Sequence, residues 1–261
     1  MIRWGRLRHL SPLLLALLGR LTLAAPLPQI GAEDDWYPYT ALRDGEIRGM
    51  SADIVRAAFA AADTPVELIA YPYARCMYLA RIGKLAGCFN TTPDEQVRHD
   101  FRLPRQALFN DDILIWTRRS QATPLTQLAD LSGRRIAVTL GYEYGPSFDG
   151  YSGVQRIAVR QDINGFRMLE RGRVDYSIAF RGTSEQLFRD NPSLQGLFQP
   201  VYTAHQAELF LSFSREHRDA RRLLQQFERG MQIIAKNGRY QQILSQWQHQ
   251  RPTLLKADTR H

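Results

Sequence analysis

The sequence is poor in the residues that build metal and redox centres. It has 2 cysteines, Cys76 and Cys88, and 6 histidines in 261 residues. No CxxC or HExxH motif and no clustered His/Cys spacing occurs, so we expect neither a metal site nor a cofactor.

Long hydrophobic runs are also missing. An apolar stretch from Leu13 to Ala25 is interrupted by Arg20 and falls short of the about 20 residues that a membrane span needs. Arginines and no acid precede it, which predicts a secretory signal peptide over residues 1–24, cleaved near Ala24. The alternative is an uncleaved membrane anchor, which the internal arginine disfavours.

Basic runs with interleaved aromatic residues are absent as well. The formal net charge is +8, but residues 1–24 contribute four arginines and no carboxylate, so cleavage leaves +4. The remaining basic residues are scattered, and we expect no nucleic-acid partner. The roughly 237 residues that remain suit two lobes of about 100 residues each.

Helix-like and strand-like segments alternate through the first half. Residues 51–62 have an apolar stripe at helical spacing, and residues 66–69 alternate as a strand does. A second helix is expected over 75–82, ended by Gly83, and a strand over 88–90. This succession predicts a mostly parallel sheet flanked by helices.

The second half repeats the alternation. Gly182-Thr183-Ser184-Glu185 has a capping-box pattern that predicts another helix start. The other elements are expected as strands at 113–117, 136–140, 174–180 and 208–214, and as helices at 163–171, 219–236 and 240–248.

Several motifs follow one another in a characteristic order. An aromatic turn, Trp36-Tyr37-Pro38-Tyr39, precedes the helix that opens at Gly49-Met50-Ser51, and the strand Cys88-Phe89-Asn90 leads into Thr91-Thr92-Pro93-Asp94-Glu95. A final strand, a long helix, Asn237-Gly238 and a last helix containing Trp247 close the chain. This order resembles periplasmic solute-binding proteins of family 3, the polar amino-acid-binding type that serves ABC transporters.

The resemblance implies an α/β fold of the two-lobe, periplasmic-binding-protein-like (type II) kind. Each lobe is then a mostly parallel sheet flanked by helices, and the chain makes two hinge crossings. Lobe 1 is expected to comprise 25–110 plus 207–250, and lobe 2 to comprise 111–206 with the hinge segments. Residues 251–261 are expected to form a flexible tail.

The resemblance also implies a function. The chain is expected to be a periplasmic monomer without enzymatic activity that captures a small polar or amino-acid-like ligand in an interlobe cleft. Its partner is then the membrane permease of an ABC importer or, as a first alternative, a membrane sensor domain. A second alternative is an exported enzyme of the cyclohexadienyl dehydratase type, with Glu95, Glu143 or His99 as the general acid. The sequence shows no recognisable pair of acid and base residues for such a reaction.

Ligands of doubly wound sheets bind beyond the carboxyl ends of strands. Aromatic walls with a few hydroxyl and amide groups suit a small polar ligand, and such residues follow several of the expected strands. The predicted ligand contacts are Trp36, Tyr39, Tyr73, Asn90, Thr91, Thr92, Gly141, Tyr142 and Glu143.

The charged anchors of the family are only partly recognisable. Its amino-acid binders hold the ligand carboxylate with an arginine, whose position here is occupied by Glu95 or Arg98, depending on the register. Their ammonium-binding aspartate is replaced by Phe180, which argues against a standard α-amino acid held in the usual way. Arg75, at the start of a helix, is predicted to replace the family arginine as the partner of the ligand carboxylate. Glu143 is a candidate to bind a cationic group of the ligand. For both, an ordinary exposed side chain is the competing interpretation.

The two cysteines have two interpretations. Export implies an oxidising compartment, and a helix packed on its own next strand would bring Cys76 close to Cys88. The alternative is a pair of small buried apolar residues. The sequence leaves both open, because it does not fix the Cα separation that a disulfide requires.

Overall fold

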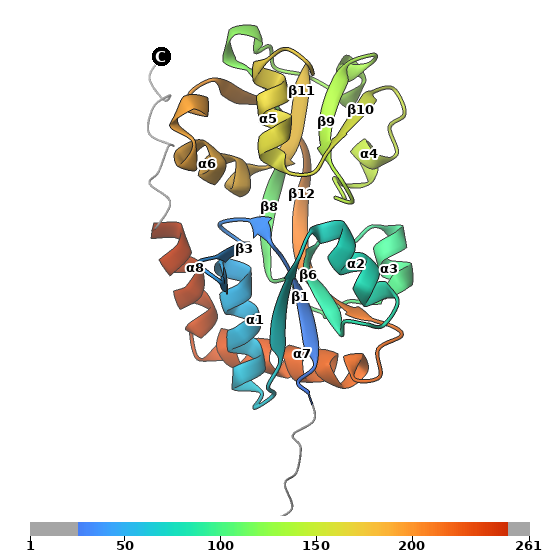
Figure 1. Cartoon of the computed structure of the whole chain (residues 1–261), viewed down its shortest axis with the longest axis vertical. Coiled ribbons are helices and arrows are strands. Elements are labelled where there is room, and N and C mark those ends of the chain that lie inside the picture. The colour runs from blue at the N-terminus through green and yellow to red at the C-terminus, as the bar shows by residue number, and fades with distance from the viewer. Residues whose placement is uncertain (1–25, 250–261) are drawn as a thin grey trace, which may run out of the picture.

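The protein consists of two α/β lobes joined by two long strands (Figure 1), as seen in a computed structural model that describes residues 26–249. Strands β8 (Phe109–Arg118) and β12 (Phe198–Ser214) pair in antiparallel fashion and run from one lobe into the other. The connection is therefore a two-stranded ribbon. The predicted signal peptide and tail lie outside the described residues.

Each lobe places parallel strands on its own side of this ribbon. The strand order is β10-β9-β11-β8-β12-β6-β1-β5, with β7 (Phe101–Arg102) paired to β12. The two-lobe α/β fold expected from the sequence is thus confirmed, and every antiparallel pairing within this sheet involves β8 or β12 of the ribbon. The parallel strands are β1 (Gln29–Glu33), β5 (Glu67–Tyr71) and β6 (Gly87–Thr91) in lobe 1, and β9 (Arg135–Thr139), β10 (Gln155–Val159) and β11 (Tyr176–Phe180) in lobe 2.

The lobe boundaries predicted from the sequence, at residues 110/111 and 206/207, lie within the ribbon. Asp112 of β8 pairs with Gln206 of β12, and Asn110 pairs with Glu208. The exact residues at which one lobe ends and the other begins stay a prediction.

Helices cover both lobes, and a small sheet caps lobe 1 (Figure 1). None of the helices in residues 26–249 is long and apolar enough to cross a membrane. Lobe 1 has α1 (Met50–Ala61), α2 (Tyr73–Arg81), α3 (Glu95–Asp100), α7 (Ala220–Lys236), α8 (Arg239–His249) and the sheet β2 (Asp35–Trp36), β3 (Thr40–Arg43), β4 (Glu46–Arg48); lobe 2 has α4 (Pro146–Asp149), α5 (Asp162–Glu170) and α6 (Arg181–Asp190). Short 3₁₀ segments lie at Arg119–Gln121, Leu128–Leu131 and Pro192–Leu194.

Aromatic residues fill the core of each lobe. In lobe 1, Phe59 of α1 and Phe227 of α7 have ring centroids 5.4 Å apart. In lobe 2, Phe166 of α5 lies 6.0 Å from Trp116 of β8 and 5.2 Å from Phe198 of β12. Close-packed interiors of this kind resist deformation, so we expect relative motion of the lobes to be concentrated in the ribbon.

The predicted capping box at the start of α6 is wrong. The helix begins at Arg181, and its N-cap residue is Phe180, which has no side-chain acceptor. The hydroxyl groups of Thr183 and Ser184 instead donate to the Phe180 carbonyl oxygen. Both hydroxyls lie inside the helix, where bonding back to a preceding carbonyl group is the local alternative to capping.

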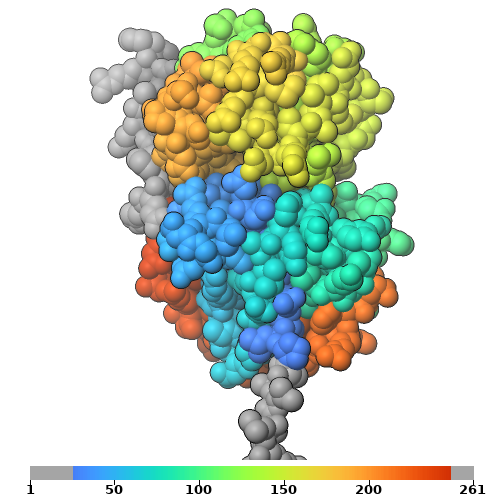
Figure 2. Space-filling model, in the orientation of Figure 1, coloured from blue at the N-terminus to red at the C-terminus, as the bar shows by residue number. Residues whose placement is uncertain are grey.

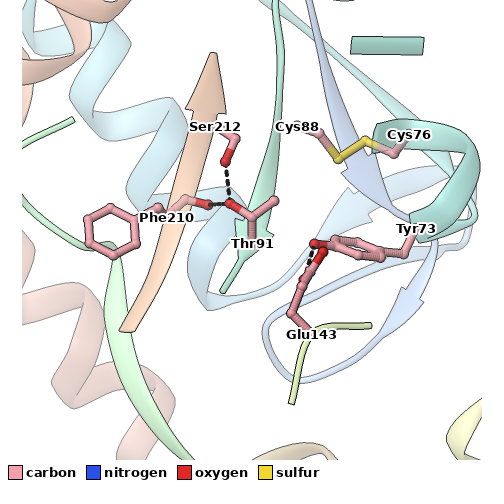
Figure 3. Close-up of a disulfide and its surroundings, with 7 residues drawn as sticks. All are labelled: Tyr73, Cys76, Cys88, Thr91, Glu143, Phe210 and Ser212. Atoms are coloured by element: carbon pink, nitrogen blue, oxygen red, sulfur yellow. Dashed lines mark hydrogen bonds between the residues drawn. A yellow bond between two sulfur atoms is a disulfide. The ribbon is translucent and has the colours of Figure 1, made fainter. Parts of the chain in front are cut away.

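A disulfide joins Cys76 of α2 to Cys88 of β6, with their Cα atoms 6.0 Å apart (Figure 3). β1 lies beneath it, and a Cβ atom added to Gly31 would come within 2.3 Å of the Cys76 sulfur. The absence of a side chain at this position therefore lets the strand pass under the bridge. The disulfide fixes the first turn of α2 relative to the beginning of β6.

Replacing both cysteines by alanine is expected to lower the free energy of unfolding by about 2 to 4 kcal/mol, because the bridge restricts the unfolded chain. Urea denaturation of Cys76→Ala/Cys88→Ala against the oxidised parent measures the change. A reducing agent should destabilise the parent and leave the double variant unaffected. Equal urea midpoints for variant and oxidised parent would contradict a stabilising bridge.

Candidate functional site

A small cavity of about 10 Å³ lies between the two lobes. The lobes meet along a seam in the space-filling view (Figure 2). A volume of this size holds about one water molecule, so side chains of the two lobes occupy nearly all the space between them. The lining residues are Glu33, Trp36, Tyr73, Asn90 and Thr92 from lobe 1, and Tyr142, Glu143 and Phe180 from lobe 2.

Tyr142, in the loop after β9, forms the aromatic centre of this site. Its ring centroid lies 5.3 Å from that of Tyr73, 6.4 Å from Trp36 and 6.4 Å from Phe180, in edge-to-face arrangements. Its hydroxyl group donates a hydrogen bond to the Glu33 carboxyl group at the end of β1. Tyr142 of lobe 2 is thereby inserted among aromatic and acidic residues of lobe 1.

Glu143 forms the second carboxyl–phenol pair between the lobes. The hydroxyl group of Tyr73, at the start of α2, donates to the Glu143 carboxyl group over 2.7 Å (Figure 3). Adjacent residues of one lobe-2 loop therefore make reciprocal contacts: Tyr142 donates to a lobe-1 glutamate, and Glu143 accepts from a lobe-1 tyrosine.

Burial between the lobes shifts the titration of the acidic groups. It raises the pKa of Glu143 to about 8 and holds the pKa of Glu33 well above its usual range, although a tyrosine hydrogen bond opposes each shift. Burial likewise raises the pKa of Asp162, which accepts from Thr139 over 2.6 Å, to about 6. All three shifts have the same sign because a low-dielectric environment disfavours carboxylate ions.

Asn90 is a polar residue of the cavity wall whose side chain has no hydrogen-bond partner among the described residues. Its side chain is 5 % exposed, and no described residue gives its amide nitrogen or oxygen a hydrogen-bond partner. Its φ of 72° lies in the left-handed region, which asparagine tolerates better than most residues. The neighbouring Trp36, 2 % exposed, has an indole N–H likewise without a partner among the described residues. Buried polar groups normally have partners, so these two point to a function in recognition.

Two further contacts join the lobes outside the cavity. The Gln161 amide donates to Asp35, and Arg43 forms an ion pair with Asp190 at 2.9 Å. The ion-paired side chains are 42 % and 39 % exposed, and exposed pairs of this kind stabilise by at most about 1 kcal/mol. The buried carboxyl–phenol pairs are thus the more consequential contacts.

Several residues that the sequence predicts as ligand contacts lie away from the cavity. Tyr39 is buried and donates from its hydroxyl group to Asp111 in the ribbon. The Thr91 hydroxyl group is hydrogen-bonded to Ser212 and to the Phe210 carbonyl group (Figure 3). Gly141 is exposed, with a φ of 81°, and brings the lobe-2 loop against α2. Tyr39 thus contacts the ribbon, Thr91 bonds to the neighbouring strand β12, and Gly141 lies where the two lobes meet.

The predicted arginines are also outside the cavity. Arg75 is exposed on α2, with its guanidinium carbon 5.8 Å from the Tyr71 ring centroid. Arg98, like Glu95 and His99, is exposed on α3. Tyr73 and Cys76 define the buried side of α2, and Arg75 lies about 200° around the helix from Tyr73. The helix period therefore directs Arg75 to the surface.

Glu33 is the lining residue that the sequence analysis missed. It is the first of three consecutive acids, Glu33-Asp34-Asp35, a run typical of a solvated turn. The signal that marks it is its place at the carboxyl end of the first strand, next to the aromatic turn. Phe180 lines the cavity at the position where the resemblance called for an aspartate. Within residues 26–249 no group of His, Cys, Asp and Glu is arranged to hold a metal ion.

Comparison with known proteins identifies the family. The model of the bacterial extracellular solute-binding proteins, family 3, matches residues 29–250, so the chain belongs to this family. No curated protein matches the sequence.

Solved structures agree with the fold. A mutant of the arginine-binding protein ArgBP from T. maritima superposes with a TM-score of 0.72 at 16% identity, covering 84% of this chain and 94% of that one. The arginine-, lysine-, histidine-binding protein ArtJ from Geobacillus stearothermophilus gives 0.72 at 15% identity, covering 87% and 97%. A histidine kinase sensor domain similar to periplasmic binding proteins gives 0.73 at 22% identity, covering 85% and 95%. At these identities the similarity establishes the two-lobe fold alone.

Raising the pH is expected to separate the lobes in solution without added ligand. A carboxyl group whose pKa is raised in the closed form stabilises that form at low pH, and the stabilisation is lost as the pH rises through the raised pKa. The loss therefore begins near the ordinary pKa values of 3.8 and 4.5 and is complete near pH 6 for Asp162 and near pH 8 for Glu143. Small-angle X-ray scattering should give a larger radius of gyration at pH 9 than at pH 5.5.

Glu143→Gln provides the comparison, because glutamine keeps an acceptor for Tyr73 and does not ionise. The variant should stay compact to a higher pH than the parent. Identical scattering of the parent at both pH values would contradict the assigned role of the buried acids.

Proposed function

We propose that this solute-binding protein captures a small polar ligand in the interlobe cavity and delivers it, in the periplasm, to the permease of an ABC importer. The observation that carries the proposal is a cavity with walls from both lobes and an unsatisfied, buried Asn90 amide in one of them. A ligand that touches both lobes binds the closed form more tightly than the open one, which is the condition for ligand-driven closure.

The ligand is bound and released unchanged in this proposal. Of the candidate general acids for the dehydratase alternative, Glu95 and His99 are exposed on α3. Glu143 remains at the cavity, and its carboxyl group is used in contact with Tyr73. The partner is a membrane permease, and a sensor domain would require the same capture step.

A thermal-shift screen of amino acids, amines, organic acids and short peptides tests ligand capture. A true ligand at 100 times its Kd adds about 2.7 kcal/mol to the free energy of unfolding and so raises Tm. It should also reduce the radius of gyration at pH 9, where the lobes are expected to be apart. A protein that no compound stabilises or compacts would contradict the proposal.

Asn90→Gly is expected to weaken binding of the ligand so identified by about tenfold, since a ligand group loses its hydrogen-bond partner in a buried site. Glycine accepts the positive φ of this position, and no described residue loses a hydrogen bond to the Asn90 side chain. Isothermal titration calorimetry measures the affinity.

Asp63→Gly is the matched control, because Asp63 is exposed after α1 and has a φ of 50°. This control should bind as the parent does. An Asn90→Gly variant with parental affinity would remove Asn90 from the site.

A further inference from the structure

We infer that the ligand of the interlobe cavity is a small organic cation without a carboxylate group, held by Glu33 and Glu143 between aromatic walls. This inference rests on the proposed function and narrows its ligand class. Four observations carry it: the charges of the lining, the aromatic rings, the positions of the arginines, and the unsatisfied Asn90 amide.

The cavity lining is acidic in a basic protein. The whole chain has a formal net charge of +8, yet the described residues that line the cavity include two glutamates and no lysine, arginine or histidine. Asp34, Asp35 and Asp162 lie near enough to Glu33 to raise its pKa further. Such a site repels an anion and attracts a cation.

Each glutamate has acceptor capacity to spare. Glu33 accepts from Tyr142, and Glu143 accepts from Tyr73, whereas a carboxylate offers about four lone-pair positions. A ligand ammonium group can therefore be added to either carboxylate or replace the phenol that now donates to it. The attraction between opposite charges offsets the cost of ionising a buried carboxyl group.

Aromatic rings form the rest of the wall. Trp36, Tyr73, Tyr142 and Phe180 all line the cavity, and the centroids of Trp36 and Phe180 are 4.9 Å apart. The faces of such rings attract organic cations, and desolvation in a closed site strengthens that attraction. The combination of carboxylates and ring faces suits a primary amine or a quaternary ammonium group.

A ligand carboxylate has no cationic partner in this cavity. Arg75 and Arg98 are exposed on α2 and α3, outside the lining. A carboxylate brought between the lobes would meet only neutral donors, and its negative charge would further disfavour ionisation of Glu33 and Glu143. An α-amino acid is therefore disfavoured relative to the same molecule without its carboxylate.

The Asn90 amide indicates which neutral polar group the ligand carries beside its cationic group. Both of its polar atoms are buried on the wall and lack a partner among the described residues. A hydroxyl or carboxamide group of the ligand can donate to the amide oxygen and accept from its nitrogen. The cavity volume of about 10 Å³ also requires Tyr142 and Glu143 to move as the ligand enters, which favours a small molecule.

Matched compounds that differ in the carboxylate test the inference on the unmodified protein. The sets are choline against glycine betaine, agmatine and argininamide against arginine, and ethanolamine and serinamide against serine. Calorimetric titration at pH 7.5 measures each Kd. We expect at least one cation to bind, with an affinity at least tenfold above that of its carboxylate counterpart.

The outcomes separate this inference from the proposed function. Tighter binding of a carboxylate member overturns the cation assignment and leaves ligand capture intact. Binding of neither member in any set also overturns it, and the broader screen then decides whether the protein captures a ligand at all.

Glu143→Gln tests the contact itself. It should weaken binding of the preferred cation at least tenfold, because the charge is lost while the side-chain shape and the acceptor for Tyr73 are kept. Glu170→Gln, at the exposed end of α5, should bind as the parent does. Unchanged affinity in a folded Glu143→Gln variant, judged by circular dichroism and Tm, contradicts the assignment of Glu143.

Discussion

The contact between the lobes depends on two partly buried carboxyl–phenol hydrogen bonds, Tyr142 to Glu33 and Tyr73 to Glu143. Transfer of an ionised carboxylate out of water is costly unless it is compensated, and here the nearest compensation is a neutral phenol. The consequence is a raised pKa at both glutamates. We therefore expect closure of the lobes to be coupled to proton uptake, or to the arrival of a positive charge that replaces the proton.

This coupling gives the acidic residues a physical reason to occupy the cavity. Apolar residues would close the lobes without an electrostatic cost, but they would close them regardless of ligand. In the proposed mechanism these acids weaken closure near neutral pH, and a bound cation supplies the stabilisation that is then missing. Because each lobe has a rigid core and the β8–β12 ribbon joins them, we expect a local contact in the cavity to change the relative orientation of the two lobes.

Much of the fold could be predicted because it follows from periodicity. The stripe that predicts a helix over 51–62 corresponds to α1, and the long helix expected over 219–236 corresponds to α7. β10 was not predicted: its strand, Gln155–Val159, lies at the sheet edge, with a mostly exposed face and little apolar alternation. The three short strands of the β2–β4 sheet were not predicted either, because two to four residues are too few to show a period.

The cavity was predictable to a smaller extent. Loop aromatic residues and the Asn90 amide follow expected strand ends, and the structure brings Trp36, Tyr73, Asn90 and Tyr142 together around one cavity. Helix phase, which depends on exact helix boundaries, places Arg75 on the surface outside the cavity lining, and its predicted contact with a ligand stays a prediction. Only Glu33 of the three consecutive acids lines the cavity. Which of the three does so depends on how the end of β1 packs against lobe 2, and a local sequence pattern does not encode that packing.

A crystal structure with the best-binding cation of the matched sets tests the central claim most directly. The account predicts electron density for the ligand between Trp36 and Tyr142, with its cationic group within about 4 Å of a Glu33 or Glu143 oxygen, an ion-pair distance, and a neutral group at Asn90. A ligand seated elsewhere, such as the surface groove beside Trp247, with both tyrosine–glutamate hydrogen bonds intact, would contradict it.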